Sequence, residues 1–206
     1  MELYSPSLFI EINTSEYIFA VGDENEKRDF KIIYKHNTPI QGFENFKVTS
    51  LDIALDVIKK NIYLIEQKLN FQFKKAIIVI DNLNCSFINL TGFKKLNGSQ
   101  ILKENISYIL NSLKSTINET EKKKVITHMF NSNYFLDGIK NENLPIGLFG
   151  DFYSQELSFC LLNNNDYKNL NNIFDKVNLK IKRILFKGFV EGSYLSNKHE
   201  KVDTFY

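Results

Sequence analysis

Apolar and polar residues alternate in three short segments near the start of the chain. Residues 8–13 and 17–23 flank the small turn Thr14-Ser15, and residues 29–35 follow a charged stretch. Alternation with a period of two, bounded by turn residues, is typical of strands. The beginning of the chain is therefore predicted to form a three-stranded meander.

The period of the apolar positions then changes to that of a helix. Between residues 51 and 69 apolar side chains recur at helical spacing, and Thr49 or Ser50 can cap the segment. Residues 75–81 follow as an almost uninterrupted apolar run, which is typical of a strand covered on both faces. The order predicted for this first part is thus βββαβ.

The middle of the chain has a different order of elements. Residues 85–94 predict a strand, and Ser99 can cap a helix whose apolar positions run from 101 to 113. Residues 125–130 and 146–162 predict two further strands. The order of this middle part is βαββ.

The βαββ part lies between a strand and the helix expected to follow that strand. Residues 167–177 carry one apolar face, which predicts this helix, and residues 179–186 predict a last strand. The fold class predicted is therefore α/β. Residues 1–84 plus 163–206 are expected to form one domain, and residues 85–162 an inserted subdomain.

Composition narrows the classes of function. Of 206 residues, 43% are hydrophobic and 24% are charged, which suffices for a core without disulfides or metal. The net charge of +2 gives no basic face, so a nucleic-acid partner is not predicted. The sequence shows neither a signal peptide nor an apolar run of ~20 residues, so a cytoplasmic protein with reduced cysteines is expected.

Candidate groups for chemistry are few. Cys85 and Cys160 are far apart and form no CxxC pair, so no metal site is predicted. His128 has no second histidine near it in the sequence, and an isolated histidine is more often structural than catalytic. Asp137 before Gly138 is predicted to shape a turn. No catalytic residue is predicted.

Residues 125–162 carry three elements in a fixed order. These are His128, the segment Tyr134-Phe135-Leu136-Asp137-Gly138, and residues 143–150, which read Asn-Leu-Pro-Ile-Gly-Leu-Phe-Gly. This pattern resembles the insertion subdomain of the bacterial cell-division protein FtsA, where a histidine precedes Tyr-x-Leu-Asp-Gly and Asn-Pro-x-Gly-Met-x-Gly. Two positions depart from it: Leu144 is inserted, and Leu148 replaces Met. The flanking residues 8–81 and 164–196 match in pattern, so the resemblance covers nearly the whole chain.

The resemblance implies both a fold and a function. The fold is one actin-like (ribonuclease H-like) lobe with an inserted βαββ subdomain of SHS2 type. The function is that of a cell-division scaffold at the inner face of the plasma membrane, which links FtsZ filaments to the membrane and to later division proteins and self-associates into filaments. Its partner contacts are expected within residues 85–162, where strand edges offer a natural surface for a neighbouring chain.

The resemblance also identifies the first turn of the chain as a phosphate loop. In the family this loop reads Asp-x-Gly-Thr/Ser-Ser/Thr-Lys, and its backbone N–H groups cradle phosphates. Here Glu11 keeps a carboxylate, Asn13 replaces the glycine, and Thr14 and Ser15 keep the hydroxyls. Asn13 is expected to tolerate the left-handed backbone of a glycine, whereas Glu16 brings negative charge near a triphosphate. An ordinary hairpin turn is the alternative.

The family binds ATP with magnesium between two lobes. Its second phosphate loop, adenosine-binding loop and membrane-binding terminal helix correspond to positions after Tyr206, so this chain is expected to match the N-terminal part. Tight binding of ATP and magnesium by this chain is not expected, because one lobe and a degenerate loop supply only part of the site. Enzymatic turnover, as in the phosphotransferases of the same superfamily, is not expected from it either.

A second scaffold function remains open. The actin-like cytosolic protein of type IV pilus machines shares the lobe and a similar insertion, and it binds the cytoplasmic tail of an inner-membrane protein. The Tyr-x-Leu-Asp-Gly and Pro-x-Gly pattern favours the division protein. Division genes or pilus genes beside this gene would discriminate between the two.

Overall fold

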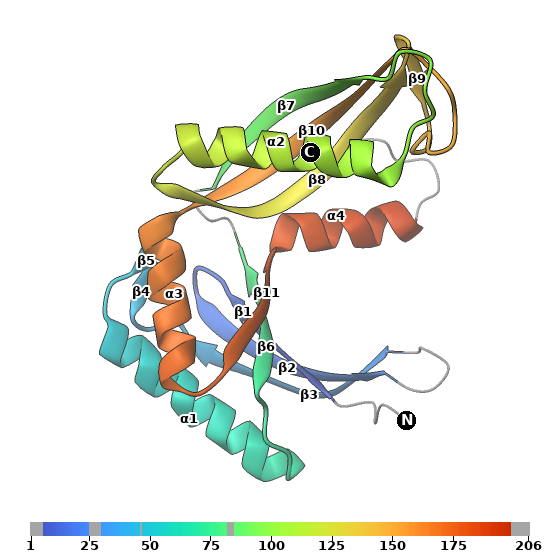
Figure 1. Cartoon of the computed structure of the whole chain (residues 1–206). Helices are drawn as coiled ribbons and strands as arrows, with labels where there is room; N and C mark the ends of the chain where they lie inside the picture. Colours follow the sequence, from blue (N-terminus) through green and yellow to red (C-terminus); the bar gives the residue numbers. More distant parts are fainter. Residues whose placement is uncertain (1–5, 25–29, 46, 82–84, 199–206) are drawn as a thin grey trace. The chain divides into compact units, whose positions relative to one another are not determined.

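The chain forms two compact units. A computed structural model describes residues 6–24, 30–45, 47–81 and 85–198. Met1–Asn84 with Asp166–Tyr206 form the first unit, called here the host unit, and Cys85–Asn165 form the inserted unit (Figure 1). The division falls at Asn165 and not at the expected Leu162, because the last strand of the inserted unit runs beyond Leu162.

The host unit is built on a mixed five-stranded sheet. Its strands are β1 (Ser7–Ile12), β2 (Glu16–Glu24), β3 (Phe30–Pro39), β6 (Lys75–Ile80) and β11 (Lys180–Phe186), in the order β11-β6-β1-β2-β3. The predicted meander β1-β2-β3 is antiparallel, whereas β6 and β11 run parallel to β1. The carboxyl ends of β1, β6 and β11 therefore meet at one edge of the sheet.

Helix α1 (Leu51–Leu69) follows the sequence pattern closely. Ser50 is its N-cap, and the Ser50 Oγ accepts a hydrogen bond from Ile53 N, which satisfies one of the free N–H groups of the first turn. Asn70 ends the helix in a left-handed conformation with φ 49°. The side chains of α1 that face the sheet are buried: Ala54, Ile58, Asn61, Ile62 and Ile65.

One feature of the host unit was not predicted from the sequence, and another lies where the resemblance of residues 181–196 places a helix start. A small hairpin, β4 (Phe43–Glu44) with β5 (Lys47–Val48), precedes α1. After α3 (Asn164–Lys176) and β11, a further helix, α4 (Lys187–Lys198), begins directly at the end of the strand. The predicted strand at 29–35 is longer, reaching Pro39, and its expected first residue, Asp29, lies outside the described residues.

The inserted unit confirms the predicted βαββ order and adds one short strand. Its elements are β7 (Ser86–Lys95), α2 (Lys103–Thr120), β8 (Lys124–Leu136), β9 (Ile139–Asn141) and β10 (Phe152–Asn163). The four strands form an antiparallel sheet in the order β7-β10-β8-β9. Figure 1 shows α2 lying across this sheet. Alternate residues of β10 face α2 and are fully buried, including Tyr153, Leu157 and Phe159.

Helix α2 begins later than expected. Its first residue is Lys103, and Leu102 N donates to Asn105 Oδ1 at 2.7 Å. Ser99, the predicted cap, lies in a turn instead, where Gly150 N donates to Ser99 O at 3.3 Å. Strand β10 likewise begins at Phe152 and not just after Pro145, because residues 145–150 form a loop that packs along residues 98–101.

The residues that carry the family resemblance hold this loop in place. Asp137 and Gly138 form the turn between β8 and β9, with φ 50° and 80°. The Asp137 Oδ1 accepts hydrogen bonds from Asp151 N at 2.9 Å and from Phe152 N at 2.7 Å. A Cβ atom at Gly150 would lie 2.4 Å from Leu136 Cδ1, so a larger residue there requires the Leu136 side chain to shift. The expectation that Asp137 shapes a turn is confirmed.

Candidate functional site

Three charged side chains meet at the carboxyl edge of the host sheet. Glu11 lies near the end of β1, Asp81 follows β6, and Lys187 follows β11. The Lys187 Nζ lies 3.0 Å from Glu11 Oε1 and 3.9 Å from Asp81 Oδ2. Open α/β sheets bind ligands at this edge, because loops after neighbouring parallel strands converge there.

The lysine of this cluster is held in its charged form. The hydrogen bond to Glu11 raises the pKa of the Lys187 ammonium, and the negative charges of Glu11, Asp81 and Glu191 act in the same direction against some desolvation. The Lys187 side chain is 31% exposed and that of Glu11 is 21% exposed. The pair is therefore partly shielded from water, which makes it stronger than a fully exposed ion pair.

The turn next to this cluster is closed by Asn13. The Asn13 Oδ1 accepts hydrogen bonds from Ser15 N at 2.9 Å and from Glu16 N at 2.8 Å. Asn13 N in turn donates to Glu16 O at 3.1 Å. This is the bonding of an Asx turn. The left-handed backbone that asparagine can tolerate is not used here, since the φ of Asn13 is not positive.

The structure thus brings together only part of the predicted phosphate loop. Glu11 faces Lys187, whereas Thr14 and Ser15 are exposed at the tip of the turn. The sequence analysis missed Asp81 and Lys187. The signal that could have found them is their position, since Asp81 is the last residue of one predicted strand and Lys187 directly follows another, and the carboxyl ends of both strands point to the same edge of the sheet.

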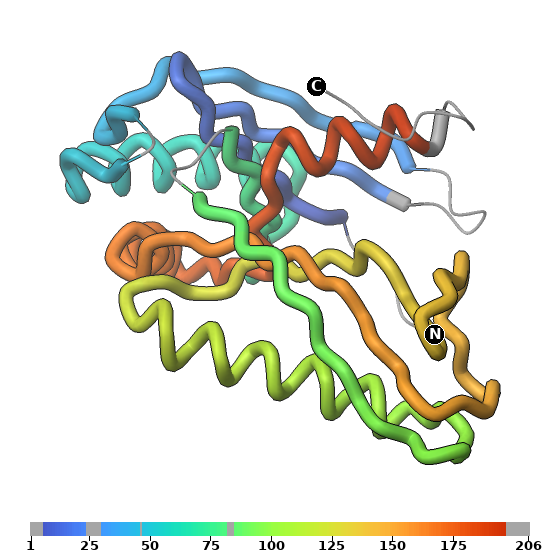
Figure 2. The backbone as a smooth tube through the Cα atoms, turned by 90° about the horizontal axis from the view of Figure 1, so that it is seen from above, coloured from blue at the N-terminus to red at the C-terminus, as the bar shows by residue number. Residues whose placement is uncertain are grey.

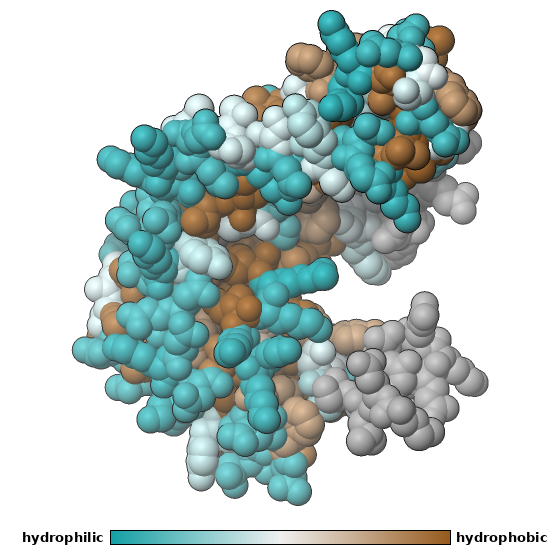
Figure 3. Space-filling model, viewed as in Figure 1, coloured by the Kyte–Doolittle hydropathy of each residue, from teal (hydrophilic) through white to brown (hydrophobic). Residues whose placement is uncertain are grey.

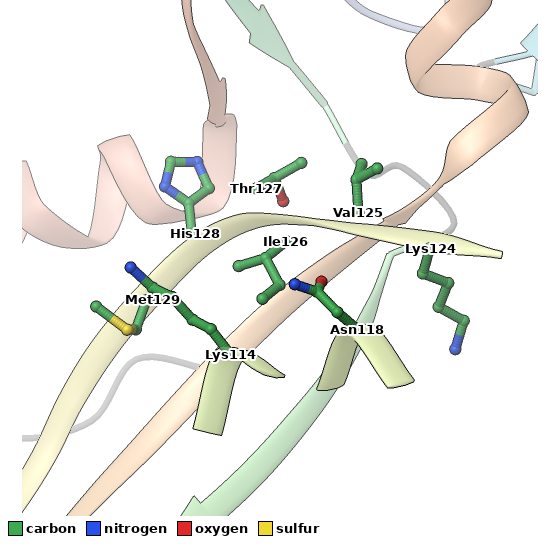
Figure 4. A pocket seen from close by; sticks show the side chains of 8 residues that line it. All are labelled: Lys114, Asn118, Lys124, Val125, Ile126, Thr127, His128 and Met129. Atoms are coloured by element: carbon green, nitrogen blue, oxygen red, sulfur yellow. The ribbon is translucent and has the colours of Figure 1, made fainter. Parts of the chain in front are cut away.

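A second candidate region is an open groove in the inserted unit. It has a volume of about 480 Å³ and lies between α2 and β8. Figure 4 shows Lys114 and Asn118 of α2 on the same side of β8 as Ile126, with His128 on the other side. His128 stacks on Phe130, with ring centroids 5.6 Å apart.

A third region is the end of the inserted unit that carries β9. Ile139 is 72% exposed and Phe149 is 70% exposed, and the loop residues Ile146 and Leu148 are also exposed. These four residues are called here the apolar tip. Figure 3 shows brown, hydrophobic surface among teal at this end of the unit. Clustered exposed apolar side chains are typical of interaction surfaces.

Within the described residues, no group of three or more His, Cys, Asp or Glu side chains could hold a metal ion. Among the same residues, no helix combines the length and the apolar character needed to cross a bilayer.

The chain was compared with known proteins. Neither the protein-family models nor the curated proteins give a match. Among solved structures, a chain of the PilM–PilN type IV pilus biogenesis complex aligns with a TM-score of 0.58 and 8% identity, over 95% of this chain. The chain has an actin-like fold.

The predicted actin-like lobe is thereby confirmed, and the comparison does not identify FtsA. A Bacteroides thetaiotaomicron protein with an actin-like ATPase fold and unknown function also aligns, at 13% identity over 94% of this chain and with a TM-score of 0.37. This actin-like chain spans about half of each of these two solved chains, 52% and 56%.

Proposed function

We propose that this protein is an actin-like scaffold whose inserted unit binds other polypeptides. The actin-like fold is compatible with a scaffold, because assemblies as well as enzymes use this fold. Since one fold serves several functions, the surface residues decide between them. The observation that carries the proposal is the apolar tip, whose Ile139 on β9 and Phe149 in the loop before β10 are exposed by 72% and 70%. Exposed aromatic and aliphatic side chains on an ordered loop suit a protein interface.

A paired substitution tests the tip. Ile139→Ser with Phe149→Ser removes apolar contact area without touching the buried core, so the variant should stay folded. The matched control is Ile32→Ser on β3 of the host unit, which is also exposed. Sedimentation velocity at rising concentration should show self-association of the wild type and of the control, weakened at least about tenfold in the tip variant.

The first setting proposed for the scaffold is cell division. The pattern from His128 to Gly150 supports this reading, with FtsZ filaments, later division proteins and the inner face of the plasma membrane as expected surroundings. Deletion of residues 85–162 in the native gene should then block septation and give elongated cells. Normal septation in that deletion would count against the division role.

The second setting is type IV pilus assembly, and the structural match supports it. The aligned solved chain belongs to a pilus biogenesis complex and has a TM-score of 0.58. In this case the same deletion should abolish pili and leave septation intact. A binding assay with peptides from the FtsZ C-terminus and from the cytoplasmic tail of a pilus inner-membrane protein separates the two settings in vitro. Binding of neither peptide, with normal septation and pili, would overturn both.

A further inference from the structure

The actin-like fold implies ATP and magnesium at the carboxyl edge of the host sheet, so the residues there can be tested for fit. Magnesium takes oxygen ligands at about 2.1 Å in octahedral geometry and keeps several waters. Glu11 and Asp81 supply carboxylates of the right kind. The question is whether the space and the charge between them are available to a metal ion.

The position between the two carboxylates is taken by a side chain. The Lys187 ammonium lies 3.0 Å from Glu11 Oε1 and 3.9 Å from Asp81 Oδ2. A magnesium ion bound to the same Glu11 oxygen would lie only a few ångströms from this positive charge, and two like charges at such a distance repel by several kcal/mol at protein dielectric, on the order of 4 kcal/mol per unit charge. The metal does not fit while Lys187 stays.

The donors that a phosphate would need are also taken. Ser15 N and Glu16 N both donate to Asn13 Oδ1. The Glu16 carboxylate is held beside the turn by a hydrogen bond from Asn37 Nδ2 at 3.0 Å. A phosphate oxygen would have to displace the Asn13 side chain and then approach a carboxylate, which costs electrostatic energy.

We propose that the host unit occupies its own nucleotide site: Lys187 stands where a divalent cation would bind, and Asn13 Oδ1 stands where a phosphate oxygen would bind. In the place of a nucleotide, these side chains connect the segments that meet at the carboxyl edge of the host sheet. Lys187 is the first residue of α4, so its ion pairs join the start of that helix to β1 and to the segment after β6. The actin-like lobe keeps this arrangement without ATP.

Removal of the lysine should uncover the cation site. In Lys187→Met the aliphatic part of the side chain stays, whereas the charge between Glu11 and Asp81 is lost. Mn²⁺ is the probe, because it prefers the same oxygen ligands and its free concentration can be counted by electron paramagnetic resonance. The variant should bind one Mn²⁺ at least about tenfold more tightly than the wild type.

Matched variants keep this test specific. Lys182→Met removes an exposed lysine of β11 away from the cluster and should bind Mn²⁺ no better than the wild type. Adding Asp81→Asn to Lys187→Met should cancel the gain. Circular dichroism and urea unfolding show whether each variant is folded, and Lys187→Gln serves if Lys187→Met is not.

Three results would overturn the proposal. The first is Mg²⁺-dependent ATP binding by the wild-type chain in calorimetry. The second is an absence of Mn²⁺ binding by the folded Lys187 variants. The third is an equal gain in Lys182→Met. None of these results depends on whether the inserted unit binds a partner. This inference and the proposed scaffold function are therefore tested independently.

Discussion

Two turns of this molecule use the same chemistry over different distances along the chain. In the host unit, Asn13 Oδ1 accepts hydrogen bonds from the N–H groups of Ser15 and Glu16, two and three positions on. In the inserted unit, Asp137 Oδ1 accepts from Asp151 N and Phe152 N, 14 and 15 positions on. Each side chain satisfies two backbone donors that the strands leave unpaired.

The difference explains why one turn is ambiguous in the sequence and the other is specific. A local Asx turn needs only one suitable residue, so it occurs in many unrelated hairpins. The Asp137 turn needs a left-handed Asp-Gly pair, a glycine at position 150 and a loop of fixed length between them. The motif that resembles the division protein is therefore a structural requirement of the inserted unit, and it carries information on fold more than on function.

The largest effect is expected at Asp137. Asp137→Ala removes two hydrogen bonds to a carboxylate and places alanine at φ 50°, which should lower the free energy of unfolding by about 3 kcal/mol. Asp137→Asn keeps an acceptor and tolerates the left-handed backbone, so it should lose less than half of that. Urea unfolding measures both. Equal losses in the two variants would show that the hydrogen bonds contribute little.

A smaller loss is expected at Gly150. A methyl group there would lie 2.4 Å from Leu136 Cδ1 and 2.9 Å from Asp137 Oδ2, so Gly150→Ala should cost about 2 kcal/mol. Gly188→Ala in α4 is the matched control, because its added methyl group meets no atom within 4 Å. The control should be neutral or slightly stabilising. A neutral Gly150→Ala would mean that the loop moves freely, and it would contradict the statement that the Asp137 turn needs a glycine at position 150.

The local turn should contribute least to stability. Asn13→Ala removes one acceptor from an exposed hairpin, which should cost about 1 kcal/mol, and Asn13→Asp should retain most of it. Thermal unfolding followed by circular dichroism measures the three proteins side by side. A loss in Asn13→Ala as large as in Asp137→Ala would break the distinction between the two turns.

The smallest effect is expected on the rate at which the buried Cys160 thiol is labelled, which reports local opening of the structure around it. Cys160 is fully buried, and burial together with the neighbouring Cys85 raises the pKa of its thiol to about 12. Because the Cys160 side chain is fully buried, its alkylation requires local opening of the structure around it. In a Cys85→Ser background, Asp137→Ala should speed Cys160 labelling, whereas Asn13→Ala should leave it unchanged.

The order of elements was predictable where the pattern is local. The cap at Ser50, the helix from Leu51 to Leu69 and the βαββ order follow from spacing alone. The periodicity alone does not predict helix α4, because Gly188 and Gly192 lower its helix propensity, and only the resemblance of residues 181–196 places a helix start there. Ser99 was expected to cap α2, but the loop from Pro145 to Gly150 engages that segment from far along the chain.

The candidate site was predictable only in its local part. Glu11 and Asn13 are only two positions apart in the sequence, so they could be recognised together. Asp81 and Lys187 are separated from them by whole elements, and only the parallel arrangement of β1, β6 and β11 brings them together. The contact of Asp81 and Lys187 with Glu11 depends on the order of the strands in the sheet, which cannot be derived from the spacing of residues in one sequence.

The first and last strands of the inserted unit pair with each other, and this has a consequence for how the unit could be exchanged in evolution. Ser86 at the start of β7 lies opposite Leu161 near the end of β10, so the chain enters and leaves the unit side by side, as the green and orange segments of Figure 2 show. Adjacent paired strands are about 5 Å apart. To the surrounding lobe, the whole segment is therefore equivalent to a short surface loop, and its length costs little closure entropy. A cassette attached in this way can be exchanged or enlarged by recombination while the lobe that carries it continues to fold.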